Sequence, residues 1–238
     1  MELKLRLILK EIPWYLVIKA LGLAWLWLWL PFWLWFVITL FVFYRAEGDP
    51  TVSYSRSFWV FALISGSLLY LPDYFKIWSL FWVATSMFLL MGLKEIFFAK
   101  KAVVLRALQI VLFLGGLTTF FWWSFYDAHF ILRYLILFLA TYWLFADLAK
   151  VIAGESQAVF WGGLATFLTI QITYATSLLS VEFADKAAIV LLGIIAIQEF
   201  LVRGERGKEI KPNFYLGLGS LFSAIFLLIV FLSDWSLI

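Results

Sequence analysis

The chain has 238 residues, of which 65% are hydrophobic and 14% are charged, and its formal net charge is +3. Soluble globular domains are closer to half apolar, and a chain of this length could not bury such an excess in one core. Cysteine is absent and His129 is the single histidine, which excludes disulfides, cysteine nucleophiles and metal sites built from thiolates or several histidines. We therefore expect no cofactor and no metal, and the small positive charge gives no reason to expect a nucleic-acid partner.

The hydrophobic residues form continuous blocks that are separated by short charged stretches. A helix needs roughly 20 apolar residues to cross the hydrocarbon layer of a membrane, and in lipid only helices and closed barrels satisfy their backbone hydrogen bonds. A barrel would need alternating segments of about 10 residues, whereas these blocks are continuous. The sequence therefore predicts an all-α, polytopic integral membrane helical bundle with eight or nine membrane-embedded helices, organised as a single transmembrane domain over residues 1–238. The blocks are 12–44, 58–71, 77–93, 108–126, 130–146, 159–179, 187–202 and 214–232.

The first block contains the stretch WLWLWLPFWLW at residues 25–35, in which Trp and Leu alternate around Pro31. Strict alternation is typical of a half-buried strand, but an isolated strand inside lipid leaves its backbone unpaired. On a helix, steps of two residues rotate by about 200°, so these tryptophans spread around the cylinder. Because Trp favours the membrane–water interface, we interpret the stretch as a helical tryptophan collar. The collar consists of Trp25, Trp27, Trp29, Trp33 and Trp35.

The same block is long enough for two short helices, or for an in-plane amphipathic helix followed by one long crossing. A turn at residues 30–31 is favoured by Pro31, which suits the first position of a helix. Such a turn would also place the basic N-terminus on the side of the other basic loops. Against it, no Asn, Asp or Ser marks the turn, and residues 31–44 are short for a full crossing. We expect two short helices and nine segments in total, with eight segments as the alternative.

An internal repeat is suggested by Glu95, Asp147 and Glu199, which follow apolar blocks at positions that differ by 52 each time. The interval predicts a helical hairpin that is repeated in parallel orientation. Similar helix and loop lengths would also align by accident, so both interpretations stay open. The repeat units would be 44–95, 96–147 and 148–199, followed by a partial unit 200–238 and preceded by an amphipathic or hairpin segment 1–43.

The three acids Glu95, Asp147 and Glu199 are expected at the cytoplasmic boundary of the membrane. An ionisable group inside hydrocarbon is costly and by default marks a functional site. Asp147 with Lys150, and Glu199 with Arg203, are spaced for local ion pairs along one helix. We therefore favour charged helix ends that reach the headgroup region.

The orientation of the chain follows from its basic loops, because Lys and Arg concentrate on the cytoplasmic side of membrane proteins. The loops 94–106 and 203–211 are rich in Lys and Arg, whereas the loops on the opposite side, at residues 73–76, 127–133 and 182–186, are poor in them. We place both basic loops in the cytoplasm and the C-terminus outside. The expected location is the cell (plasma) membrane, as a multi-pass protein.

Asp127, His129 and Arg133 lie together at one outer helix boundary. Asp127 and His129 are residue types that act as acid and base, and Arg133 suits an anionic headgroup. No Ser or Cys nucleophile stands at a recognisable spacing. We therefore expect a headgroup or ligand contact and no catalytic residue, with a lipid-headgroup enzyme at Asp127 and His129 as a remote alternative.

The block at residues 159–180, VFWGGLATFLTIQITYATSLLS, carries small and hydroxyl residues at steps of three and four. These steps place them on one face of a helix. The face would either line the path of a small solute or pack against a neighbouring helix, where small residues admit a backbone and hydroxyls form hydrogen bonds. We favour packing, and we expect Gln171 on the opposite face to need its own partner. The face consists of Gly162, Thr166, Thr169, Thr173, Thr176 and Ser180.

No nucleotide-binding loop, zinc-protease motif or serine-hydrolase motif is present in the sequence. The favoured function is a non-catalytic polytopic membrane protein that binds a partner, a lipid or a hydrophobic ligand. A small-solute transporter that uses the hydroxyl face of residues 159–180 is the alternative. The expected partners are membrane lipids, and another membrane protein or a second copy of the chain.

Overall fold

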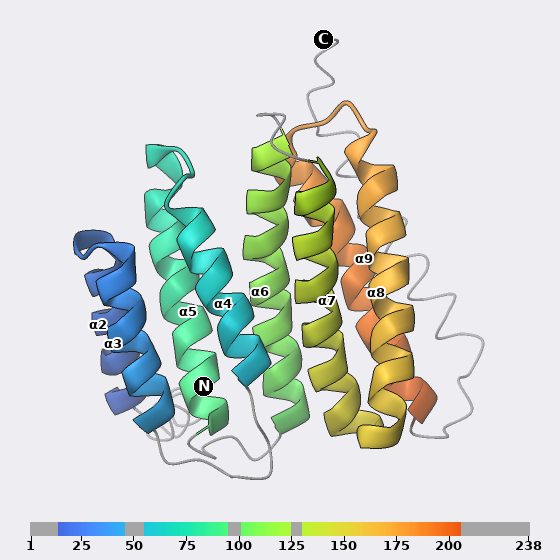
Figure 1. Ribbon diagram of the computed structural model, residues 1–238, viewed down its shortest axis with the longest axis horizontal. Coiled ribbons are helices and arrows are strands. Elements are labelled where there is room, and N and C mark those ends of the chain that lie inside the picture. Colours follow the sequence, from blue (N-terminus) through green and yellow to red (C-terminus); the bar gives the residue numbers. More distant parts are fainter. Residues whose placement is uncertain (1–13, 46–54, 95–100, 125–129, 206–238) are drawn as a thin grey trace, which may run out of the picture.

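The computed structural model describes residues 14–45, 55–94, 101–124 and 130–205 (Figure 1). This part of the chain is all-helical, as predicted, and no strand occurs among the described residues. Continuous apolar composition and the absence of internal proline account for the length of the later helices. The elements are α2 (Trp14–Trp29), α3 (Phe32–Arg45), α4 (Ser55–Leu68), the 3₁₀ turn η1 (Asp73–Phe75), α5 (Lys76–Lys94), α6 (Lys101–Ser124), α7 (Phe130–Ala153), α8 (Glu155–Ser177) and α9 (Phe183–Glu205).

Within the described residues, four segments are long and apolar enough to cross a membrane. They fall in four consecutive helices, α5 to α8, and the shorter α2 and α3 are also apolar. A total of eight or nine crossings therefore stays a prediction. The four segments are Asp73–Leu93, Ala102–Ser124, Phe130–Ile152 and Gln157–Ser177.

The helices stand side by side, and successive helices run in opposite directions (Figure 1). α2 and α3 form one edge of the bundle, α6 and α7 lie near its middle, and α8 and α9 form the other edge. α7 and α8 are separated by Gly154 alone, whose φ of +84° is a backbone conformation that glycine adopts without strain. We call this end of the bundle the Gly154 end, and the opposite end, which holds the turn after α4, the Tyr70 end.

The predicted break in the first apolar block is present, because Leu30 and Pro31 separate α2 from α3. The helices have 16 and 14 residues, which corresponds to about 24 and 21 Å. Each is shorter than a hydrocarbon layer of roughly 30 Å. The expectation of two short helices is therefore confirmed, whereas their placement across a membrane stays a prediction.

The packing of α2 and α3 divides the tryptophan collar into buried and exposed rings, and its place at a membrane interface stays a prediction. Trp27 and Trp35 are buried. The indole N–H of Trp27 donates to the carbonyl oxygen of Ser65 at 3.2 Å, and that of Trp35 to the carbonyl oxygen of Leu23 at 2.8 Å. The first bond joins α2 to α4, and the second joins α3 to α2. The exposed members are Trp25, Trp29 and Trp33.

The predicted repeat units coincide only in part with the helices. Units 44–95, 96–147 and 148–199 each contain two helices, but the boundary at 147/148 falls inside α7, which continues to Ala153. The segment 94–106 is also not a loop throughout, because α6 already begins at Lys101. The 52-residue repeat therefore stays a prediction, as does the cytoplasmic placement of these segments.

Candidate functional site

Glu199 forms an ion pair between two helices. Its Oε2 atom lies 2.6 Å from Nη2 of Arg106 on α6, and both side chains are largely buried. The sequence predicted a pair with Arg203 along α9 instead, and the side chain of Arg203 is outside the described part. Because α6 and α9 pack against each other, a cation far away in the sequence reaches the carboxylate.

Next to this ion pair, two buried glutamines connect three helices. Gln198 Nε2 donates to Gln109 Oε1 at 3.0 Å, and Gln109 Nε2 donates to the carbonyl oxygen of Leu144 on α7. Both glutamines have no exposed surface. Removal of one buried amide leaves its hydrogen-bond partner buried and unpaired, and that partner then costs its full desolvation free energy. The bonds of such a network therefore contribute more to stability together than each bond does alone.

We expect Gln109→Leu to lower the free energy of unfolding by about 1–3 kcal/mol, since it leaves the Gln198 amide buried without its acceptor. The double variant Gln109→Leu/Gln198→Leu should lose less than the single one, because both partners are then apolar. Reversible unfolding in mixed micelles measures both values. Gln171→Leu is the matched control, because Gln171 is exposed on α8, and a double variant that is less stable than Gln109→Leu would contradict the network.

Asp147 also contacts a neighbouring helix. Its Oδ2 atom accepts a hydrogen bond from Ser57 Oγ at 3.0 Å, and its Oδ1 atom lies 3.9 Å from Nη1 of Arg56. Ser57 is the third residue of α4, and its backbone N–H also donates to this carboxylate. Asp147 therefore supplies α4 with a cap from another helix, where a negative charge is favoured by the helix dipole. The third predicted boundary acid, Glu95, lies outside the described residues.

The small and hydroxyl face of α8 is turned toward α7. The four threonines of the face are buried, and each donates its hydroxyl to the carbonyl oxygen four residues earlier, at 2.7–2.8 Å. A Cβ atom on Gly162 would lie 3.2 Å from backbone atoms of Ala146, so the two helices touch there. These contacts favour the packing interpretation. The threonines are Thr166, Thr169, Thr173 and Thr176, whereas Ser180 is exposed and lies beyond Ser177, where α8 ends.

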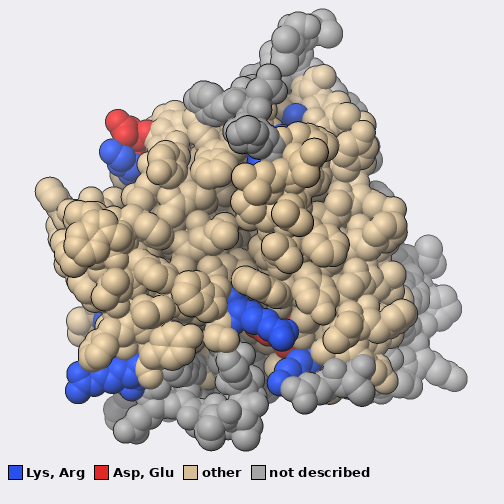
Figure 2. Space-filling view, in the orientation of Figure 1, with Lys and Arg blue, Asp and Glu red and all other residues tan. Residues whose placement is uncertain are grey.

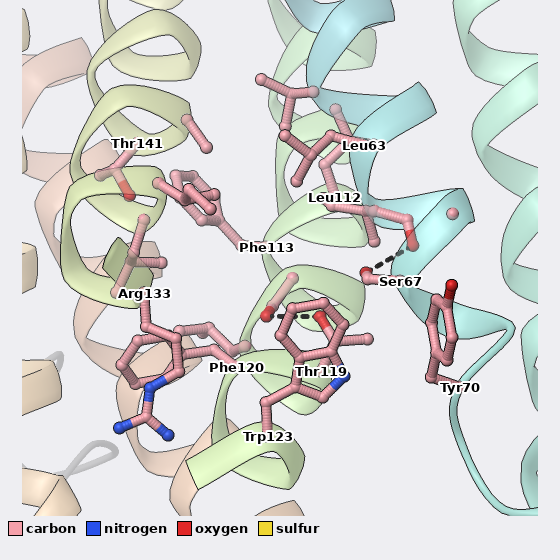
Figure 3. Close-up of a pocket in the computed structure, with 18 of the residues that line it drawn as sticks. Leu63, Ser67, Tyr70, Leu112, Phe113, Thr119, Phe120, Trp123, Arg133 and Thr141 are labelled. Carbon is pink, nitrogen blue, oxygen red and sulfur yellow. Dashed lines mark hydrogen bonds between the residues drawn. The ribbon is translucent and has the colours of Figure 1, made fainter. Parts of the chain in front are cut away.

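The predicted headgroup contact is described in part. Asp127 and His129 lie outside the described residues, and Arg133 lies in the first turn of α7. Arg133 borders a cavity of about 320 Å³ at the Tyr70 end, which we call the Arg133 cavity (Figure 3). Cavities that bind small molecules start near this size, at roughly 300 Å³.

The Arg133 cavity lies between α3, α4, α6 and α7, and its walls are apolar. Leu63 and Tyr70, with exposed fractions of 52% and 73%, belong to its lining, so the cavity reaches the molecular surface. Small residues on three helices belong to the lining, and two of them, Gly66 and Gly116, admit the side chains of Phe32 and Ile64 from neighbouring helices. The small residues are Gly66, Ser67, Gly116 and Ala140.

The polar lining residues of the Arg133 cavity differ in their bonding: Ser67 and Thr119 donate to carbonyl oxygens of their own helices, whereas atoms of Arg133 and Thr141 lack such partners. The guanidinium carbon of Arg133 lies 5.3 Å from the ring centre of Phe120, a cation–π contact. Nε and Nη1 of Arg133 are buried and have no hydrogen-bond partner among the described residues. The same is true of the Thr141 hydroxyl, which lines the cavity. Two buried N–H donors at the edge of an apolar space are costly unless an acceptor binds there.

Arg133 could be identified from the amino-acid sequence, but the cavity beside it could not. The cavity forms where four helices meet, and the spacing of residues along one helix does not indicate which helices meet. The available signals were the small residues in the apolar blocks, which also occur at helix contacts.

Comparison with protein-family models, curated protein sequences and solved structures finds no match for this chain.

Proposed function

We propose that the protein is a non-catalytic, multi-pass membrane protein that binds an amphiphile with one anionic head and a hydrocarbon chain. The anionic head, a carboxylate or a phosphate, contacts the guanidinium of Arg133, and the chain fills the Arg133 cavity. The observation that carries the proposal is that two buried nitrogen atoms of Arg133, at the edge of an open apolar cavity, have no hydrogen-bond partner in the described part of the chain.

The chemistry of the cavity selects such a ligand. A planar guanidinium binds carboxylate or phosphate through two parallel hydrogen bonds. The walls of the cavity offer Leu, Ile, Val and Phe side chains, which gain free energy by covering a hydrocarbon chain. A small hydrophilic solute would find no hydrogen-bond partners along these apolar side chains, so it is a poorer fit than an amphiphile.

The charge distribution supports a membrane setting. Figure 2 shows that the charged side chains on this face lie near the ends of the bundle, and that uncharged surface covers its middle. More of the described basic residues belong to the Gly154 end than to the Tyr70 end, so we place the Gly154 end in the cytoplasm. Basic residues of the Gly154 end are Arg45, Arg56, Lys94, Lys101, Arg106 and Lys150.

Labelling with a diazirine-bearing fatty acid, followed by peptide mass spectrometry of the purified protein, tests the proposal. We expect crosslinks on residues that line the cavity and at least a fivefold loss of labelling in Arg133→Gln. Arg45→Gln is the matched control, because Arg45 is a cation at the other end of the bundle. Equal labelling of both variants would contradict the role of Arg133.

Filling the cavity is a second test that leaves the charge unchanged. Ala140 lines the cavity, so Ala140→Phe should exclude the chain and reduce crosslinking several-fold. Ala175 is exposed on α8, away from the cavity, so Ala175→Phe should label like the unmodified protein. A phospholipid that carries the same diazirine chain shows whether a carboxylate or a phosphate is the better head. Unchanged labelling in Ala140→Phe would place the amphiphile elsewhere.

A further inference from the structure

The Arg133 cavity is open along one side. α4 and α7 are held together at the Gly154 end, where Ser57 Oγ donates to Asp147 Oδ2 at 3.0 Å. Toward the Tyr70 end both helices line the cavity, and its floor is α6, whose lining residue Leu117 has no exposed surface. Leu63 on α4 also lines the cavity, yet 52% of it is exposed. The cavity is therefore a groove with a closed floor and an apolar rim that faces outward from the bundle.

The Arg133 cavity has about the depth of one membrane leaflet. Its lining on α6 runs from Leu112 to Trp123, about 17 Å along the helix, and a hydrocarbon layer of roughly 30 Å has leaflets of about 15 Å. Figure 3 shows Arg133, Trp123 and Tyr70 toward one end of the cavity and Leu63 toward the other. The rings of Tyr70 and Trp123 meet edge to face, with centroids 6.2 Å apart, and both residue types concentrate at the membrane–water interface. We therefore expect the end with Arg133 at the headgroup level.

The outer surface of α4 continues the rim of the cavity. Trp59 and Leu63 are four residues apart, which places them on one face of the helix. Their exposed fractions are 45% and 52%, and Trp59 does not belong to the cavity lining. We call these two side chains the α4 stripe. Leu63 belongs to both surfaces, so one hydrocarbon chain inside the cavity and another on the α4 stripe would lie on either side of it.

We infer that the ligand of the Arg133 cavity is a two-chain anionic phospholipid from the leaflet at the Tyr70 end. Its phosphate contacts Arg133, one chain fills the cavity and the second chain lies on the α4 stripe. Because the side opening faces hydrocarbon, the second chain stays in the bilayer, and its contacts with the stripe add dispersion attraction. The inference rests on the proposed function for the head and the first chain, and it adds the second chain and with it the class of lipid.

Native mass spectrometry of the full chain in detergent tests the inference with phosphatidylglycerol and with lysophosphatidylglycerol that carries one of the same chains. We expect the two-chain lipid to bind at least fivefold more tightly. Trp59→Ala/Leu63→Ala removes the α4 stripe and should reduce this ratio to less than twofold. Leu21→Ala/Trp25→Ala is the matched control, because it removes the same residue types at the same spacing from α2, where they are 52% and 58% exposed and lie outside the cavity lining. It should keep the ratio, and unchanged melting temperatures check both folds.

The head and the second chain fail separately in this experiment. Arg133→Gln should weaken the binding of both lipids at least fivefold and leave their ratio unchanged, because it alters the contact with the phosphate alone. Equal affinity of the unmodified protein for both lipids would overturn the inference, as would an equal effect of the two double variants on the ratio. Unaltered binding of both lipids to Arg133→Gln would instead contradict the proposed function, whereas the ratio would still report on the α4 stripe.

Discussion

Gly162→Leu is expected to lower the free energy of unfolding by about 3 kcal/mol or more, since insertion of bulk into a packed contact costs 1–3 kcal/mol and occasionally more. A Cβ atom at this position already lies 3.2 Å from Cα and N of Ala146. These are backbone atoms of α7 and cannot rotate away. The leucine would therefore force α7 and α8 apart along the face that carries the buried threonines. Reversible unfolding in mixed micelles measures the loss.

The adjacent glycine gives a matched control for this variant. A Cβ atom on Gly163 would have no atom within 4 Å, so Gly163→Leu adds the same side chain to the same helix without a clash. We expect its stability to be equal to that of the unmodified protein or slightly higher, because leucine favours the helix over glycine. Equal losses in both variants would show that the α7–α8 contact at Gly162 is not the cause.

The helices and their contact faces could be predicted where one residue type dominates a local pattern. Continuous apolar blocks indicated the later helices, and Pro31 indicated the break between α2 and α3. The face of α8 was also readable, because glycine at position 162 and threonines at helical spacing are typical of close helix packing. In these cases the information lies within one or two turns of the chain.

Contacts between distant helices could not be predicted in the same way. Glu199 has Arg203 one turn away in the sequence, but the ion pair that the structure describes joins it to Arg106, 93 residues earlier. Trp27 is buried against α4, whereas Trp29 is exposed. The alternation of Trp and Leu in the sequence gives no sign of this difference. Partner choice and ring orientation depend on how the helices are arranged, which a single sequence without homologues does not report.

The Arg133 cavity shows the same limit at the level of the site. Its lining comes from four helices, and Arg133 lies at an opening that the sequence presents as an ordinary charged helix end. Arg133 was identified as a headgroup contact from residue type alone. The approach of Arg56 to Asp147 could not be predicted in this way, because it arises only when the first turn of α4 packs against the last turns of α7.

Asp147→Ala should cost about 1–3 kcal/mol of unfolding free energy, the range for a lost hydrogen bond to a charged group. The variant removes the acceptor for the Ser57 hydroxyl and backbone N–H, so α4 loses the cap at its N-terminus. Asp147→Asn keeps an acceptor oxygen but loses the charge, so its free energy of unfolding should lie between those of the unmodified protein and Asp147→Ala. Asp73→Ala is the matched control, because Asp73 forms an exposed ion pair with Lys76 at 2.8 Å, and such pairs contribute about 0–1 kcal/mol.

A double-mutant cycle separates the cap from a general effect of charge. If Asp147 acts through Ser57, the variant Asp147→Ala/Ser57→Ala should lose less than the two single losses together, because one interaction is removed twice. The same cycle with Arg56→Gln measures the attraction across 3.9 Å, which should be the smaller coupling because the guanidinium is half exposed. Additive losses for Asp147 and Ser57 would show that the carboxylate does not hold α4 in place.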